Sequence, residues 1–173
     1  MAILGDNSDG AETFPGNPDR AIVTRFTATA SGTSGTGYAY FALDSIAGSS
    51  AKLVIYSNVA GAPSALIGSS AGAVVPAGGG LINLGAITAT IVDTVQYFVG
   101  VVWSDYQGIV SADAVETEDT EMANGTLSYT TPPATWPGTS ATYGIRINAW
   151  IDYGAGAASP FPPWPQRVYQ RGF

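Results

Sequence analysis

Residues 143–151 read YGIRINAWI, and apolar and polar side chains alternate along them. One side of this stretch carries Tyr143, Ile145, Ile147, Ala149 and Ile151. The other side carries Gly144, Arg146, Asn148 and Trp150. Because successive side chains of a strand point to opposite faces, the alternation predicts a half-buried β-strand.

A second stretch, VQYFVGVVWS at residues 95–104, is apolar on both faces. Val95, Val99 and Val101 fall on one side with two aromatic rings, whereas Phe98 and Val102 fall on the other. A strand with two apolar faces has to be covered on both sides. We therefore expect this segment to be a central strand of the fold.

Further strand-like runs follow at intervals of about ten residues, separated by clusters of Gly, Ser and Pro such as residues 32–37, 48–50, 61–63 and 76–80. The runs are residues 21–30, 37–43, 51–56, 65–70, 81–87, 108–115 and 125–130. No helical periodicity separates them, so crossover helices are not expected. The sequence predicts an all-β fold, an antiparallel β-sandwich of jelly-roll type with extended N- and C-terminal arms.

The expected domain organisation has three parts. Residues 1–20 are polar and rich in turn residues, and we expect an N-terminal arm. Residues 21–153 form the sandwich. Residues 154–173 are rich in proline and aromatic residues, and we expect a C-terminal arm with an extended course.

Composition argues against catalysis. The chain of 173 residues has no histidine and no cysteine, and its one lysine is Lys52. Most acid–base and nucleophilic chemistry at neutral pH uses one of these side chains. Paired carboxylates could hydrolyse a glycosidic bond, but nothing in the sequence places an acid in an apolar pocket, and Asp44, Asp93 and Asp152 fall at expected strand ends or turns. We expect no enzyme activity, no cofactor and no bound metal.

The acidic net charge of the chain argues against two classes of binding partner. The formal net charge is −7 and charged residues make up 11% of the chain, against an average of about 25%. An acidic chain repels phosphate backbones and anionic lipid, so neither nucleic acid nor membrane is an expected partner. The first residues lack the charged and apolar regions of a signal peptide, which predicts synthesis in a host cytoplasm without signal-dependent export.

The C-terminal segment has the composition of a contact surface. Proline lowers the entropy lost on docking, and aromatic residues and arginine are enriched at interface cores. Two interpretations stay open: the segment docks on a neighbouring subunit, or it folds back over its own sandwich. The predicted subunit-interaction residues are Phe161, Trp164, Arg167, Tyr169, Arg171 and Phe173.

Two other kinds of site are weaker alternatives. Aromatic residues at the surface could stack on sugars, and the candidates are Trp103, Tyr106, Trp136 and Trp150. Acids at residues 116–121 and 6–10 could hold Ca²⁺, although neither run has the order of an EF-hand loop. A solvated acidic loop and a turn, respectively, are the simpler interpretations.

One stretch resembles a known module. Residues 51–68, AKLVIYSNVAGAPSALIG, contain a strand ending in Tyr-Ser-Asn, a Gly-x-Pro turn and a Leu-Ile-Gly continuation, and residues 95–103 resemble its companion strand. Both are similar to a jelly-roll-like β-sandwich module of secreted bacterial proteins and phage virion proteins. The resemblance spans residues 20–150 and implies no catalytic residues.

Small sandwiches of this kind serve as phage capsid decoration (cement) proteins, commonly as trimers with terminal arms on the shell. The resemblance therefore implies a structural virion protein of a tailed bacteriophage, located on the capsid surface. Its partners would be a homotrimer and the major capsid protein or other virion subunits. A tail, fibre or extracellular filament subunit and a glycan-binding module are the alternatives.

Overall fold

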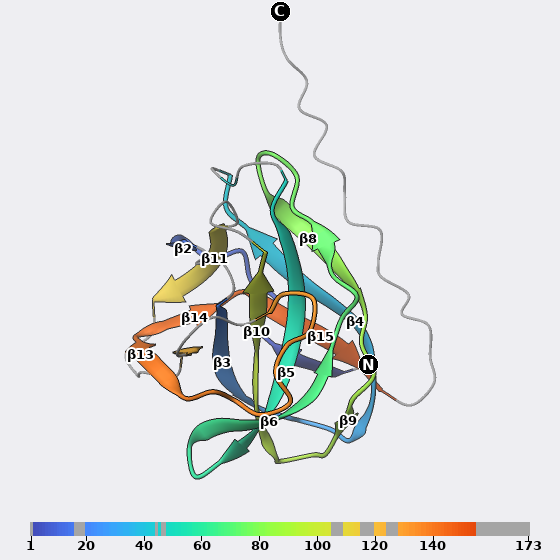
Figure 1. Ribbon diagram of the computed structural model, residues 1–173. Helices are drawn as coiled ribbons and strands as arrows, with labels where there is room; N and C mark the ends of the chain where they lie inside the picture. Colours follow the sequence, from blue (N-terminus) through green and yellow to red (C-terminus); the bar gives the residue numbers. More distant parts are fainter. Residues whose placement is uncertain are drawn as a thin grey trace, which may run out of the picture.

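The computed structural model is a sandwich of two antiparallel β-sheets (Figure 1). It describes residues 2–15, 20–43, 45, 48–104, 109–114, 120–123 and 128–154. Every strand pair in these ranges is antiparallel and none of these residues is helical, so the expected all-β sandwich is confirmed.

The larger sheet has eight strands in the described residues, and its central path runs β1-β15-β4-β11-β14. Strands β8 and β9 pair with β4, and β2 pairs with β11. Their bounds are β1 (Ala2–Gly5), β2 (Glu12–Pro15), β4 (Gly32–Phe41), β8 (Gly80–Ala86), β9 (Thr90–Ile91), β11 (Ile109–Ala114), β14 (Ile145–Ile147) and β15 (Ala149–Tyr153).

The smaller sheet has seven strands in the described residues, in the order β13-β12-β3-β10-β5-β6, with β7 paired to β5. Their bounds are β3 (Ala21–Thr27), β5 (Ser50–Val59), β6 (Ala62–Ser69), β7 (Ala73–Val74), β10 (Gln96–Trp103), β12 (Thr120–Ala123) and β13 (Thr139–Tyr143).

Strand β10 has the central place that its two apolar faces predict. It lies between β3 and β5 in the smaller sheet. Val99, Val101 and Trp103 face the core between the two sheets. Phe98 and Val102 belong to a second apolar cluster on the outer side of this sheet.

The alternating stretch 143–151 is divided between the two layers. Tyr143 ends β13 in the smaller sheet, and the chain crosses at Gly144 to β14 and β15 in the larger sheet. The inward face is as predicted, because Ile147, Ala149 and Ile151 are fully buried in the core. The expected single strand is thus divided among β13, β14 and β15, of which the last two meet at Asn148. Strand β15 is buried on both faces rather than half-buried.

The expectation that residues 1–20 form an arm is wrong for the two strands in this range. Residues 2–5 pair with β15 and residues 12–15 pair with β11. Leu4 is buried in the core, and Phe14 packs against it. These strands are too short to show a clear alternation, so local sequence gave no sign of them.

Two other local predictions need correction. The acidic run was expected to be a solvated loop through Glu121, but Thr120–Ala123 is strand β12, with Thr120 buried between β3 and β14. The predicted strand at 125–130 is wrong for residues 128–130, which form no strand; the preceding residues lie outside the described part.

The glycine-rich stretch 32–37 is the start of β4 rather than a turn. Its glycines allow close approach of other elements. A Cβ on Gly35 would lie 2.6 Å from the carbonyl oxygen of Asp152, and one on Gly37 would lie 2.9 Å from Leu53 Cδ2. Glycine here serves packing inside a strand, which composition alone does not distinguish from a turn.

Within the residues that the structure describes, no helix has the length and apolar character needed to cross a bilayer. The described chain ends at Gly154, whose backbone N–H donates to the carbonyl oxygen of Thr33 at 3.0 Å. Residues 155–173, most of the expected C-terminal arm, lie outside the described part.

Candidate functional site: the outer face of the larger sheet

The predicted subunit-interaction residues are not placed by the structure. All of them fall in the C-terminal segment beyond the described residues; they are Phe161, Trp164, Arg167, Tyr169, Arg171 and Phe173. The described surface is therefore considered from its own residues.

The proposed sugar-stacking tryptophans are not at the surface. Trp103, Trp136 and Trp150 have exposed fractions of 1%, 7% and 5%. Tyr106 lies outside the described residues. Because a sugar stacks on an accessible ring face, these three tryptophans are not available as platforms, and the weaker alternative of sugar stacking is excluded for them.

Trp136 belongs to a segment that covers the outer side of the smaller sheet. Its backbone N–H donates to the carbonyl oxygen of Ser64 at 2.7 Å, and its ring meets Tyr56 edge-on at 5.0 Å. The Tyr56 hydroxyl donates to Pro133 O at 3.1 Å, and Lys52 Nζ donates to Thr130 O at 3.0 Å. This outer face is thus occupied by the chain itself.

The outer face of the larger sheet carries a row of aromatic rings. Trp150 on β15 is opposite Tyr38 on β4, and Tyr40 is two residues farther along β4. The rings of Tyr38 and Trp150 are stacked at 5.4 Å with an angle of 21°, and those of Tyr40 and Trp150 lie 5.7 Å apart. Both tyrosines are partly exposed. We call these three residues the aromatic row.

Carboxylates stand at both ends of the aromatic row. Burial, and after it the charge of Asp152, raises the pKa of Tyr38. Burial, and after it the charge of Asp9, raises the pKa of Tyr40. Carboxylate charge thus acts on a tyrosine at each end of the row, and the positive charge of the chain's N-terminus in turn acts on Asp152.

Asp152 is an unusual member of this face. It is 6% exposed, and its Oδ2 atom has no hydrogen-bond partner among the residues described. Burial raises the pKa of its carboxyl group, because an ion loses hydration there. A buried carboxylate oxygen without a donor is costly and is satisfied by a cation or a proton donor.

The loop after β1 is fastened across the same face. Asn148 is fully buried; its Oδ1 accepts from Gly10 N at 3.0 Å, and its Nδ2 donates to Ser8 Oγ at 3.0 Å and to Asp113 Oδ2 at 2.9 Å. Asp6 forms an ion pair with Arg146 at 3.7 Å. This network fixes the loop that carries Asp9.

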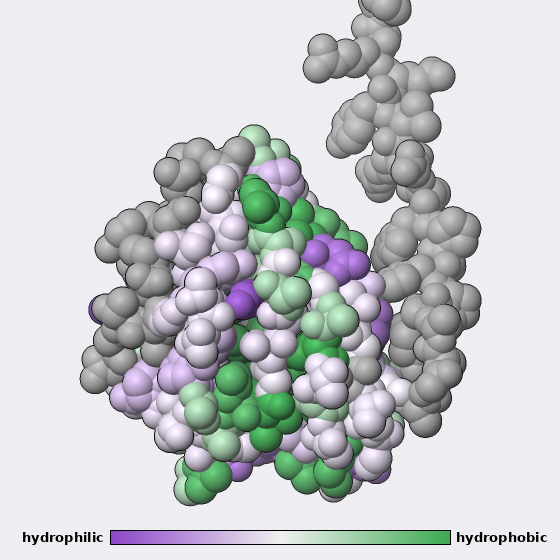
Figure 2. All heavy atoms as spheres, turned by 45° about the vertical axis from the view of Figure 1, so that its right-hand side comes forward, coloured by the Kyte–Doolittle hydropathy of each residue, from purple (hydrophilic) through white to green (hydrophobic). Residues whose placement is uncertain are grey.

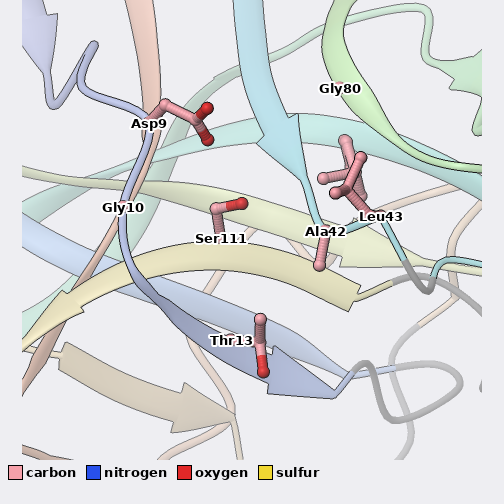
Figure 3. A pocket seen from close by; sticks show the side chains of 8 residues that line it. Asp9, Gly10, Thr13, Ala42, Leu43, Gly80 and Ser111 are labelled. Carbon is pink, nitrogen blue, oxygen red and sulfur yellow. The ribbon is translucent and has the colours of Figure 1, made fainter.

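A groove of about 460 Å³ lies at the Asp9 end of the aromatic row. Figure 3 shows Asp9 and Leu43 on opposite sides of this groove, with Ser111 between them. Leu43 is 84% exposed. The groove thus offers one acidic and one apolar wall.

The acidic runs show no metal centre within the described part of the chain, where no three acids group closely enough to hold an ion. Residues 6–10 form the expected turn, in which the backbone N–H of Ser8 donates to Asp6 Oδ1 at 2.9 Å. Of residues 116–121, only Thr120 and Glu121 are described.

Charged residues are few, at 11% of the chain. Figure 2 shows green hydrophobic patches on a pale background, with strongly hydrophilic positions few and scattered. Within the described residues, the largest exposed fractions among bulky apolar side chains belong to Leu43, Val59 and Val74. Such a surface suits contact with other protein surfaces.

Sequence reasoning missed the aromatic row. Tyr38 and Trp150 are 112 positions apart, and only the pairing of β4 with β15 brings them together. A signal existed, since Trp150 falls on the polar side of its strand and Tyr38 and Tyr40 share one side of theirs. Comparison with protein-family models and with curated protein sequences finds no match for this chain.

Proposed function

We propose that this protein is a structural virion component of a tailed phage, a capsid decoration protein that stabilises the shell through subunit contacts. In this role it works by adhesion and carries out no reaction. The residues that make the contacts are those of the C-terminal segment, among them Phe161, Trp164 and Arg167.

The observation that carries the proposal is the combination of a filled, weakly charged sandwich with an arginine- and aromatic-rich end. The two sheets bury an apolar core, and the chain covers the outer side of the smaller sheet itself. Two surfaces are candidates for contacts: the outer face of the larger sheet among the described residues, and the C-terminal segment by its composition. Both have the aromatic and charged composition of contact surfaces.

The mechanism follows from added contact area. A decoration protein that binds across a junction between shell subunits adds its binding free energy to the work of separating them. Burial of apolar and aromatic surface supplies the favourable term, less the cost of ordering the segment, and a small net gain repeated over a shell adds up. A net charge of −7 keeps decorated particles apart in solution.

The test is removal of residues 160–173 followed by assembly with phage shells. We expect the shortened protein to be folded, as judged by circular dichroism, but absent from purified particles. Normal incorporation would contradict the role of the segment. Electron microscopy of particles that carry the full chain is the second experiment. Density on a tail or fibre instead of the shell lattice would contradict the proposal of a decoration protein.

A further inference from the structure

We propose that the aromatic row and its flanking carboxylates receive the C-terminal segment, residues 160–173, of a second copy of this chain. This inference rests on the proposed role of that segment in subunit contacts, and it adds the surface that the segment binds. The acceptor is formed by Tyr38, Tyr40 and Trp150, with Asp9 at one end and Asp152 at the other.

Charge complementarity is the first argument. All 13 acids of the chain precede residue 153, together with four of its six cations, which gives that part a formal charge of 4 − 13 = −9. The segment beyond carries Arg167 and Arg171 and no acid, a formal charge of +2. On the outer face of the larger sheet, Arg146 is the described cation, and Asp6 already pairs with it.

Chemical fit is the second argument. Arginine stacks its planar guanidinium on aromatic rings and binds carboxylates through two parallel hydrogen bonds. The acceptor face offers tyrosine rings directly beside carboxylates. It also holds a carboxylate oxygen, Asp152 Oδ2, that is nine-tenths buried and lacks a donor among the residues described. That oxygen is itself covered from solvent, so its charge acts on an arginine at the surface through the field rather than through a direct hydrogen bond.

Aromatic side chains of the segment have a place on the same face. The groove beside Asp9 has the exposed Leu43 on its far wall (Figure 3). Trp164 and Phe161 lie within six residues of Arg167 in sequence. An aromatic side chain in the groove and an arginine on the neighbouring ring are therefore compatible within one short segment.

The direction of the chain favours a second copy as the donor. Strand β15 runs from Trp150 past Asp152 to Tyr153, so the chain leaves the sheet travelling away from the aromatic row. To cover its own row, the segment would have to reverse its course within residues 154–159. A proline-rich stretch of fourteen residues can span up to roughly 40 Å, which is enough to extend onto a neighbour.

The resulting contact is head-to-tail, because the segment of one copy binds a different surface on the next. Contacts of this kind close into a ring when the rotation between copies is suitable, and a ring of three is the trimer expected from the sequence resemblance. In such a ring every copy donates its segment to one neighbour and receives the segment of the other, so no acceptor face is left unoccupied.

The first experiment measures the mass of the purified full chain by light scattering, in the absence of any shell. We expect three times 17.7 kDa. Reversal of the two segment charges, Arg167→Glu with Arg171→Glu, should weaken association about tenfold or more and give monomers. The control Arg20→Glu reverses one charge beside strands β3 and β13 of the smaller sheet and should leave the trimer intact. A full chain that is monomeric at every concentration overturns the proposal.

Mixing two variants distinguishes binding of the segment to a neighbouring copy from binding to its own copy. Tyr38→Ala, or Asp9→Arg if the first variant does not fold, should also be monomeric. Mixed with the doubly charge-reversed segment variant, it should form a mixed dimer, because one partner supplies an intact segment and the other an intact face. Failure of the two folded variants to associate overturns the proposal.

Crosslinking gives an independent readout, because the chain has no cysteine of its own. Gly172→Cys and Asn7→Cys, made in separate chains, should be joined between chains by a short bifunctional reagent. Val74→Cys, exposed on the smaller sheet, should not be joined to Gly172→Cys. A chain carrying both Gly172→Cys and Asn7→Cys that crosslinks only within itself shows docking in the same copy and overturns the proposal. These experiments contain no shell, so their failure leaves incorporation into particles as a separate question.

Discussion

At the scale of single residues, two buried aromatic side chains attach a connecting segment to the smaller sheet, a role that their positions in the sequence do not suggest. Tyr56 is fully buried, and its hydroxyl donates to Pro133 O at 3.1 Å. Trp136 lies in a proline-rich connection, yet it is part of the apolar cluster outside the smaller sheet. Both residues fix residues 128–138 onto that sheet.

Tyr56 links stability to alkaline pH. Burial raises its pKa to about 12 from the ordinary value of 10.0. Between pH 10 and 12 the unfolded chain loses this proton while the folded chain keeps it, so the free energy of unfolding falls as pH rises. We expect Tyr56→Phe to be less stable by about 1 kcal/mol at neutral pH, from the lost hydrogen bond, and to lose less stability above pH 10.

Urea denaturation of both proteins at a series of pH values checks this. Tyr38 and Tyr40 are unchanged in the variant and contribute equally to both curves. The two curves should converge as pH rises from 10 to 12. Parallel curves would show that Tyr56 does not ionise in this range.

Replacement of Trp136 separates a structural role from sugar binding. Because its ring packs on Tyr56 and is almost fully buried, we expect Trp136→Ala to cost about 3–5 kcal/mol of unfolding free energy. Thermal denaturation and near-ultraviolet circular dichroism measure this loss. A variant with unchanged stability that lost binding on a glycan array would instead favour the glycan-binding alternative.

At the scale of elements, strands could be predicted where their own residues carry the pattern. The two faces of β10 and the inward face of residues 145–151 are confirmed, because period-two alternation is a local property. Strand β12 was missed because Glu121 and the acids before it outweigh its buried Thr120 and Ala123. The start of β4 was taken for a turn because its glycines serve close packing rather than chain reversal.

The hairpin between β5 and β6 offers a stabilising change. Ala60 and Gly61 both have positive φ, 53° and 89°, and they join two paired strands. Such a turn prefers Asn-Gly, since alanine is strained in this conformation. We expect Ala60→Asn to raise the free energy of unfolding by about 0.5–1 kcal/mol.

Chemical denaturation measures this gain, and the matched control is Ala62→Asn just after the turn. Ala62 is exposed and belongs to β6, where Asn is less favourable, so the control should be neutral or slightly destabilising. A loss of stability in Ala60→Asn comparable to that of the control would contradict the turn assignment.

At the scale of the whole molecule, partners distant in sequence complete the sandwich. Strand β1 pairs with β15, which ends 148 positions after β1 does, and β3 lies between β12 and β10. Alternation predicts which side of a strand is buried but not which strand lies beside it, since that depends on the burial of all strands together. For the same reason the sequence predicted the layers but not the aromatic row, which needs β4 and β15 as neighbours.

The pairing of β1 with β15 predicts how removal of the first residues lowers stability and promotes association. Removing residues 1–5 leaves β15 with an unpaired edge and takes Leu4 out of the core. We expect a loss of at least the 2–5 kcal/mol typical of a buried leucine, and association through the apolar edge Ala149–Tyr153. Denaturation and size-exclusion chromatography report the two effects separately.

The matched control is Ile3→Ala. Ile3 lies opposite Asp152 on the outer face, so this substitution should lower the free energy of unfolding far less than Leu4→Ala. Equal losses for these two substitutions would mean that β1 does not close the larger sheet with Leu4 inward.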